Sequence, residues 1–227
     1  MINRPYIVIP CYNENPDVVR TTLAGLIPMH LEIVLVDDGS REALAPHLAD
    51  LPVTVLRHPL NRGQGAALQT GMDYALRHGG DAVIHFDGDG QHNAEDIPRF
   101  LAELDRGDTD VVLGSRFLRA EDLSAVPKRK RLLLRGARLV NGLFTGLWLT
   151  DAHNGLRALG RKAMERIHLT EDRMAHASEI LIQIRRAKLK VRELPTHIIY
   201  SQYSVAKGQS IGNSLNILID LILERWL

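Results

Sequence analysis

The sequence contains very little cysteine: Cys11 is the only one in 227 residues. One thiol cannot form an internal disulfide or a zinc site built from several cysteines. Disulfide-stabilised scaffolds and cysteine-rich zinc modules are therefore excluded. We expect Cys11 to be a small, buried apolar residue, and the lack of disulfides fits a reducing cytoplasm.

The sequence also lacks a strong net charge and a long hydrophobic run. The formal net charge is +1, which gives no electrostatic sign of nucleic-acid binding, so we expect no nucleic-acid partner. The longest apolar stretches, 139–149 and 217–223, fall short of the ~20 residues that a membrane span needs. A strand-like run begins at Tyr6 and leaves no room for a signal peptide before it, so we expect no export.

What the sequence does contain is a regular alternation of apolar strands and helices, in a chain with 45% hydrophobic and 24% charged residues. Strands that are apolar on both faces and separated by helices predict an α/β fold, with a Rossmann-like, mostly parallel sheet flanked by helices. The predicted strands are 6–10, 32–36, 53–56, 82–86 and 110–113, and the predicted helices in this part are 16–27 and 65–77.

A polar or glycine-rich segment follows every one of these strands. Sheets of this kind bind ligands at the carboxyl ends of their strands, so we expect the segments to form one site. Any one of them could be an ordinary polar loop, but their shared position at one sheet edge favours a site. The segments are Cys11–Glu14, Asp37–Ser40, Asn61–Gly65, Asp87–Gln91 and Gly114–Arg116.

The segment after the fourth strand has the clearest chemistry. Asp87, Asp89 and Gln91 alternate at the strand tip and would point to one spot, where their oxygen atoms suit Mg²⁺ or Mn²⁺. Gly88 and Gly90 separate them and permit a sharp turn and a close approach. The alternative interpretation is an ordinary Asp/Gly turn after a strand.

The neighbouring segments favour a nucleotide diphosphate at this edge. Asp37 and Asp38 can accept hydrogen bonds from a base or a ribose, while Gly63 and Gly65 open a helix whose N-terminal amides favour phosphates. The sequence contains no P-loop, and no G-x-G-x-x-G follows the first strand, so these two phosphate-binding motifs are excluded.

Six motifs in this order resemble the family 2 glycosyltransferases of GT-A fold, and most of all their dolichyl- and polyprenyl-phosphate sugar transferases. The resemblance covers about residues 5–210. Two motifs depart from the family pattern: Gly90 replaces a leucine, and Asn154-Gly155-Leu156-Arg157 replaces Ser-Gly-Phe-Arg. The motifs are Ile9-Pro10-Cys11-Tyr12-Asn13-Glu14, Val36-Asp37-Asp38-Gly39-Ser40, Asn61-Arg62-Gly63-Gln64-Gly65-Ala66-Ala67, Asp87-Gly88-Asp89-Gly90-Gln91-His92, Gly114-Ser115-Arg116-Phe117 and Asp151-Ala152-His153-Asn154-Gly155-Leu156-Arg157.

The resemblance implies an activity and a set of site residues. It implies sugar transfer from a nucleotide-diphosphate sugar, with inversion at the anomeric carbon and with Mg²⁺ or Mn²⁺ held by Asp87, Asp89 and Gln91. The residues that it implies for the donor are Pro10, Tyr12, Asn13, Glu14, Asp37, Asp38, Gly63, Gln64, Asp87 and Gly88.

We expect the second half of the chain to bind a polyprenyl phosphate as acceptor. Basic residues recur on one face of a predicted helix over 128–138, beside an apolar face, which suits a phosphate-headed lipid; a solvated basic face is the alternative. Residues 203–210 are predicted to form a mobile lid over the phosphate. The expected acceptor residues are Arg116, Arg135, Arg157, Lys207 and Ser210.

The last predicted helix, 211–226, is amphipathic. It could pack on the sheet domain, lie in a membrane interface, or bind a small membrane-protein partner. We therefore expect one GT-A catalytic domain over 1–210, with a donor half (1–120) and an acceptor half (121–210), followed by the helix at 211–227. The expected location is the cytoplasmic face of a membrane.

The choice of catalytic residues depends on the acceptor. A phosphate acceptor is already ionised, so it needs positioning more than a strong base, whereas a hydroxyl acceptor needs a base. Asp151 is the favoured base and Glu179 the second candidate, for which an ordinary helix-surface carboxylate is the alternative, and Asp89 would act through the metal. Two other functions remain open: transfer to a sugar hydroxyl of a growing glycan, and a non-catalytic nucleotide-sugar-binding subunit of a membrane complex.

Overall fold

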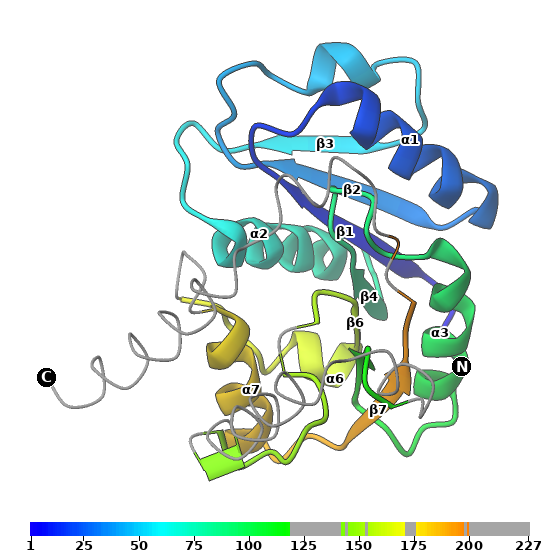
Figure 1. The fold of residues 1–227 in the computed structure, drawn as a ribbon, viewed down its shortest axis with the longest axis vertical. Coiled ribbons are helices and arrows are strands. Elements are labelled where there is room, and N and C mark those ends of the chain that lie inside the picture. Colours follow the sequence, from blue (N-terminus) through cyan, green and yellow to red (C-terminus); the bar gives the residue numbers. More distant parts are fainter. Residues whose placement is uncertain (119–141, 144, 153, 171–175, 198, 200–227) are drawn as a thin grey trace, which may run out of the picture.

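The computed structural model describes residues 1–118, 142–143, 145–152, 154–170, 176–197 and 199. These residues form a seven-stranded sheet with helices on both faces (Figure 1). The order of the strands in the sheet is β3-β2-β1-β4-β6-β5-β7. The strands are β1 (Pro5–Cys11), β2 (Glu32–Asp37), β3 (Thr54–Arg57), β4 (Ala82–His85), β5 (Val111–Ser115), β6 (Arg157–Gly160) and β7 (Val191–Pro195).

Six of the seven strands run in the same direction. β1 is parallel to β2 and β4, β2 is parallel to β3, and β5 is parallel to β7, while β6 is antiparallel to both β4 and β5. The predicted α/β fold with a mostly parallel sheet is therefore confirmed. The predicted elements of the first half are confirmed as well, with ends that differ by one or two residues.

The helices in the described residues are α1 (Pro16–Leu26), α2 (Gln64–Arg77), α3 (Ile97–Asp105), α6 (Arg161–Met164) and α7 (His176–Arg186), with short 3₁₀ helices η1 (Ile27–Met29), η2 (Ala45–Leu48) and η3 (Ala94–Asp96). The start of α1 shows why they form where they do. The side chain of Asn15 caps the helix by accepting a hydrogen bond from the amide of Asp17 (2.9 Å), and Pro16 occupies the first turn, where its missing N–H costs nothing.

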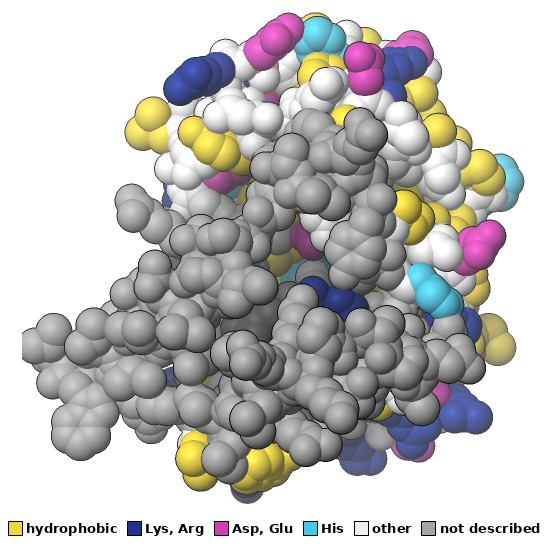
Figure 2. Space-filling model, in the orientation of Figure 1, with side chains coloured by type: hydrophobic (Ala, Val, Ile, Leu, Met, Phe, Trp, Pro, Cys, Tyr) yellow, Lys and Arg dark blue, Asp and Glu magenta, His cyan; other side chains and the backbone are white. Residues whose placement is uncertain are grey.

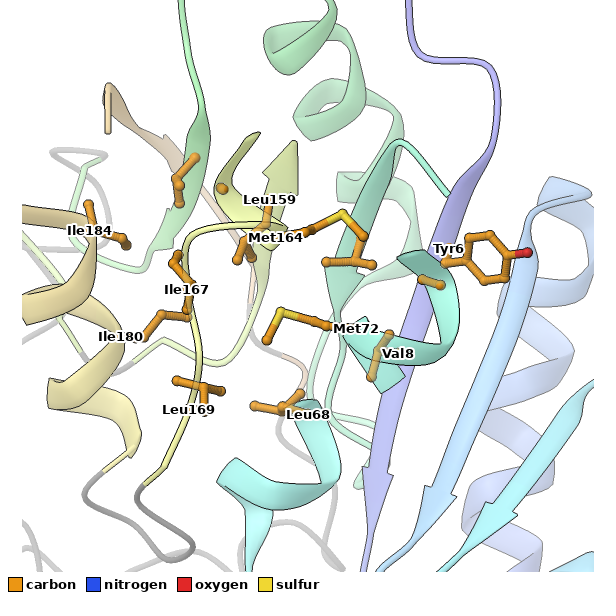
Figure 3. Close-up of a cluster of buried hydrophobic side chains, with 14 of the residues drawn as sticks. Tyr6, Val8, Leu68, Met72, Leu159, Met164, Ile167, Leu169, Ile180 and Ile184 are labelled. Atoms are coloured by element: carbon orange, nitrogen blue, oxygen red, sulfur yellow. The ribbon is translucent and has the colours of Figure 1, made fainter. Parts of the chain in front are cut away.

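Two hydrophobic cores cover the two faces of the sheet. Along β1, Ile7 and Ile9 pack toward α1 and α3, while Tyr6 and Val8 pack toward α2, α6 and α7, because successive side chains of a strand point to opposite faces. Figure 3 shows the core that contains Tyr6 and Val8, where Met72 of α2 lies between the side chains of β1 and those of α7. This burial on both faces explains the continuous apolar runs in the sequence. Cys11 is buried, as predicted.

Three predicted features lie outside the described residues: the basic helix that contains Arg135, the lid with Lys207 and Ser210, and the C-terminal helix over 211–226. The division of the chain into a donor half and an acceptor half stays a prediction. Within the part of the chain that the structure describes, no helix has the length and hydropathy required to cross a membrane.

A candidate active site at the strand tips

The five polar segments predicted to form a site follow β1 to β5, and these strands all end at one edge of the sheet. β6 runs in the opposite direction, so it begins at the same edge, with Arg157. The sixth motif, 151–157, therefore lies at the edge of the sheet where the other five motifs lie. Figure 2 shows acidic and basic side chains close to one another in the middle of this face of the molecule.

Two carboxylates lie together at the tip of β4. The Oδ1 atom of Asp87 accepts a hydrogen bond from Gln64 Nε2 (2.9 Å), and its Oδ2 atom accepts one from His92 Nε2 (2.9 Å). The Oδ1 atom of Asp89 accepts a bond from the amide of Gln91 (3.0 Å). Burial, followed by the nearby charge of Asp87, raises the pKa of Asp89.

The sixth motif packs directly against this acidic pair. A Cβ atom on Gly155 would lie 2.0 Å from Asp87 Oδ2 and 3.0 Å from His92 Nε2, so only glycine leaves room for the carboxylate. Arg157, predicted to bind the acceptor, is 3% exposed, and its Nε donates to the carbonyl of Asn154 (3.1 Å). Burial lowers the pKa of Arg157 to about 10, while the charges of Asp87 and Asp151 act in the opposite direction. Arg157 thus lies beneath the site, as a counter-charge to Asp87 and Asp151.

We expected the carboxylates of the second motif to face a base or a ribose, and the structure describes their bonds to the protein's own loops. Asp37 and Asp38 are both buried. Asp37 accepts bonds from the amides of Ser40 (2.9 Å) and Leu44 (3.2 Å). Asp38 accepts bonds from the amide of Gly63 (2.6 Å), from the amide of Arg62 (3.0 Å) and from His58 Nδ1 (2.7 Å). Both carboxylates therefore hold the loops that surround the site.

One of those loops leads into α2. Gly63 has a φ of 98°, a conformation that strongly favours glycine, and α2 begins at the next residue, Gln64. Because Asp38 holds the amide of Gly63 and Gln64 bonds to Asp87, the start of α2 is fixed beside the acidic pair. This is the position in which helix amides bind phosphates.

The first motif borders the same region. Tyr12 is 45% exposed, and Asn13 is fixed by a bond from its own amide to Ser40 Oγ (2.9 Å) and by one that its Oδ1 accepts from the amide of Arg41 (2.9 Å). A hollow beside this motif is lined by Asn13, Glu14 and Arg41, among others. Pro10 pairs with Val36 across β1 and β2. Gly88 packs against Cys11: a Cβ atom on it would lie 2.7 Å from the sulfur.

The tip of β5 carries an ion pair. Arg116 donates from Nε to Asp151 Oδ2 (2.6 Å) and from Nη2 to Asp151 Oδ1 (2.8 Å), and its amide also donates to Oδ2 (3.1 Å). The side chain of Asp151 is 3% exposed and that of Arg116 is 38% exposed. Burial alone would raise the pKa of Asp151, but the hydrogen bonds and charge of Arg116 lower it below its ordinary value. A carboxylate held in this way is a poor proton acceptor.

Glu179, the second predicted base, lies on α7. Its carboxylate accepts bonds from the amide of Thr170 (2.9 and 3.1 Å), from Thr170 Oγ1 (2.7 Å) and from Gln183 Nε2 (3.0 Å). These bonds tie α7 to Thr170, which lies between α6 and α7 in the chain. The structure therefore gives Glu179 a structural task, and its role in catalysis stays a prediction.

The chemistry of the residues at the β4 tip fits a divalent cation. In the described residues, no group of three or more His, Cys, Asp or Glu side chains has a metal-binding arrangement. The predicted set, however, consists of two carboxylates and an amide, the oxygen donors that Mg²⁺ and Mn²⁺ prefer. The bonds from Gln64 and His92 orient Asp87, as outer-shell partners orient ligating carboxylates.

Sequence reasoning missed two residues of this site. His92 stood in the fourth motif without a role, and Gly155 stood without a role in a motif that gave only Asp151 as the favoured base and Arg157 as an acceptor residue. Both residues belong to the quoted motifs: His92 follows the two carboxylates, and Gly155 stands two residues before Arg157. Only the fold shows that they meet at Asp87.

Comparisons with known proteins agree with this geometry. A family model described as Glycosyl transferase family 2 matches residues 6–168. The UDP-N-acetylglucosamine–dolichyl-phosphate N-acetylglucosaminyltransferase of Methanococcus voltae is 28% identical, over 96% of this chain and 94% of its own. The undecaprenyl-phosphate mannosyltransferase of Micrococcus luteus is 25% identical, over 98% of this chain and 93% of its own.

A solved structure shares the fold. The glucosyl-3-phosphoglycerate synthase of Mycobacterium tuberculosis, in complex with Mn²⁺, UDP and glucosyl-3-phosphoglycerate, matches with a TM-score of 0.67. It is 16% identical, and the match covers 96% of this chain and 77% of that one. At this identity the likeness shows the fold alone. The family model spans most of the chain, and the chain therefore belongs to glycosyl transferase family 2 and is a glycosyltransferase of GT-A fold.

Proposed function

We propose that this protein transfers a sugar from a nucleotide-diphosphate sugar to a polyprenyl phosphate, with inversion at the anomeric carbon and with a divalent metal ion. The observation that carries the proposal is the meeting of two charged groups at one sheet edge. The acidic pair of Asp87 and Asp89 lies at the tip of β4, and the guanidinium of Arg116 lies at the tip of β5. Relatives named as transferases to dolichyl and undecaprenyl phosphate support the same acceptor class.

Asp87, Asp89 and Gln91 would hold the metal, Mg²⁺ or Mn²⁺. A bound divalent cation would neutralise the charge that develops on the departing nucleotide diphosphate. Burial, followed by the nearby charge of Asp87, raises the pKa of Asp89, and a bound cation would stabilise both carboxylates in their charged form. The solved neighbour with Mn²⁺ and UDP supports this assignment by fold.

The donor would lie across the tips of β1, β4 and the start of α2. The amides at the start of α2 suit its phosphates, and the hollow beside Asn13 and Glu14 suits its nucleoside. Asp37 and Asp38 would act through the loops that they hold. The proposed donor residues in direct contact are Pro10, Tyr12, Asn13, Glu14, Gly63, Gln64, Asp87 and Gly88.

The ion pair at β5 favours a phosphate acceptor over a sugar hydroxyl. A phosphate oxygen is already ionised and can attack without a base, whereas a hydroxyl needs a proton acceptor. Asp151, the favoured base, is held by Arg116 and has a lowered pKa. Arg116 offers a fixed guanidinium to an anionic acceptor. Arg135, Lys207 and Ser210 remain proposed acceptor residues from the sequence.

We also propose that the protein works at the cytoplasmic face of a membrane, where a polyprenyl phosphate presents its head group. The C-terminal helix, 211–227, would bind the membrane surface or a small membrane protein. The amphipathic pattern of its sequence supports this assignment.

A transfer assay with and without metal tests the proposal. Purified protein would be incubated with undecaprenyl phosphate in detergent and, in turn, with UDP-N-acetylglucosamine, UDP-glucose and GDP-mannose. We expect a lipid-linked sugar from one of these donors, and we expect excess EDTA to abolish it. Arg116→Ala should raise the KM of the lipid far more than that of the donor. Product formed in EDTA would overturn the metal assignment, and the absence of a lipid-linked sugar with every donor would overturn the acceptor assignment.

A further inference from the structure

A carboxylate outside the six motifs holds the loop that carries Asp151. Glu193 lies on β7, beside Leu113 of β5. Its carboxylate accepts bonds from the amide of Thr150 (2.8 and 3.0 Å), from Thr150 Oγ1 (2.8 Å) and from the amide of Asp151 (3.2 Å). One side chain thus fixes two consecutive residues of this loop.

From this loop, two chains of hydrogen bonds lead to the segment around Arg116. In the first, Asp151 accepts three bonds from Arg116, one from its amide and two from its guanidinium. In the second, the hydroxyl of Thr150 bonds to the hydroxyl of Ser115 (2.6 Å), and Ser115 Oγ accepts a bond from the amide of Phe117 (3.1 Å). Glu193 therefore supports the residue before Arg116, the residue after it, and its ion-pair partner.

We infer that Glu193 is a positioning residue for the acceptor, which presets the guanidinium of Arg116 through Thr150 and Asp151. The inference rests on the proposed function, in which Arg116 binds the acceptor phosphate. A guanidinium recognises phosphate through a rigid fork of N–H groups, so its orientation must be fixed before the acceptor binds. The Asp151 carboxylate fixes that orientation only while its own backbone stays in place, and Glu193 accepts the Asp151 amide.

Glu193→Gln is the discriminating substitution, because it preserves size and removes one acceptor. In the native protein both carboxylate oxygens face N–H or O–H donors of Thr150, whereas a glutamine side chain presents one oxygen and one NH₂ group there. Glu165→Gln is the matched control. Glu165 pairs with Arg161 on α6, and the side chains of both are about half exposed (50% and 53%), outside the catalytic and binding machinery.

Steady-state kinetics with undecaprenyl phosphate give the first readout. We expect Glu193→Gln to raise the KM of the lipid by about tenfold, the change that follows from one misplaced hydrogen bond, and to leave the KM of the nucleotide sugar within twofold. In an Arg116→Ala background, the same substitution should add little to the lipid KM, because the residue that it positions is absent. Equal rises in both KM values, or full additivity with Arg116→Ala, would overturn the inference.

A spectroscopic readout separates this inference from the proposed function. The ¹⁵N–¹H signal of Arg116 Nε, assigned with Arg116→Lys, reports its bond to Asp151. We expect Glu193→Gln to shift or broaden that signal, and Glu165→Gln to leave it unchanged. An unchanged signal in folded Glu193→Gln would overturn the inference even if the enzyme transfers sugar to lipid. A changed signal in an enzyme that transfers nothing to polyprenyl phosphate would refute the acceptor assignment and support the positioning.

Discussion

The substitution Gly155→Ala tests whether the sixth motif shapes the acidic centre. The added methyl carbon would lie 2.0 Å from Asp87 Oδ2 and 2.8 Å from Asp87 Cγ. A carbon and an oxygen that are not bonded approach to about 3.3 Å at closest, so the carboxylate must retreat by roughly 1.3 Å. The bonds of Asp87 to Gln64 and His92 would be broken or bent by such a movement.

The size of the effect follows from that displacement. Forcing a methyl group into a packed site costs about 1–3 kcal/mol of folding free energy, which a domain of this size tolerates. A displacement of roughly 1 Å at a group that positions a reactant costs about 10²-fold in rate. We therefore expect Gly155→Ala to fold, to lose modest stability and to lose about 10²-fold in kcat/KM.

Urea unfolding and steady-state turnover would be measured on the same preparations, with Gly25→Ala as the matched control. Among the described residues, a Cβ atom on Gly25 would meet only Ala94 Cβ, at 3.9 Å, and Gly25 lies within α1, where alanine is the better helix former. The control should keep wild-type turnover and gain up to about 1 kcal/mol. Folded Gly155→Ala with turnover within threefold of the wild type would refute the claim that this glycine shapes the site.

Three further predictions address single carboxylates. Asp89→Ala should abolish Mn²⁺-dependent binding of UDP. The fold should survive, because the one described bond to this side chain comes from the nearby amide of Gln91. Calorimetric titration with and without Mn²⁺ measures the binding, and an unchanged affinity for UDP would contradict the prediction. The lowered pKa of Asp151 stabilises the fold above the ordinary carboxyl pKa of about 3.9, and this contribution is lost as the pH falls through the folded value. The free energy of unfolding of the wild type should therefore exceed that of Asp151→Asn by less at pH 3 than at pH 7. Urea unfolding at both pH values measures this, and an equal difference at both would contradict the prediction. Glu179→Gln should lower the melting temperature and leave kcat almost unchanged, because the carboxylate bonds to Thr170. A large fall in kcat at an unchanged melting temperature would instead support the predicted catalytic role.

The sequence predicts the first half of the fold well because its signal there is local. The apolar runs that became β1 to β5 are continuous, since both faces of the sheet are covered, and each ends in a distinct polar segment. The strands β6 and β7 have weaker signals: β6 has four residues and begins with Arg157, and exposed Arg192 and half-buried Glu193 alternate in β7. Their pairing with β4 and β5 depends on contacts distant in sequence, which periodicity does not report.

The site was predictable in place but not in detail. Asp37 and Asp38 show why: each aspartate can face a ligand, or it can accept backbone amides of the surrounding loops, and the residue types are the same in both cases. In the structure both side chains are buried and accept amides of the protein itself. The ion pair between Arg116 and Asp151 joins residues 35 apart in sequence. No local spacing therefore reveals that the predicted base and the predicted phosphate-binding residue bond to each other.

The segment from Thr150 to Arg157 contacts both charged centres of the site. Its Gly155 lies against Asp87 at the β4 tip, and its Asp151 holds Arg116 at the β5 tip. The antiparallel strand β6 lies between β4 and β5, so the segment that leads into it must cross from one tip to the other. Transfer requires the anomeric carbon and the attacking oxygen to meet at about 3–3.5 Å. Under the proposed function, in which Asp87 serves the donor and Arg116 the acceptor, this segment sets that separation. We therefore expect Gly155→Ala to lower kcat more than it raises the KM of either substrate.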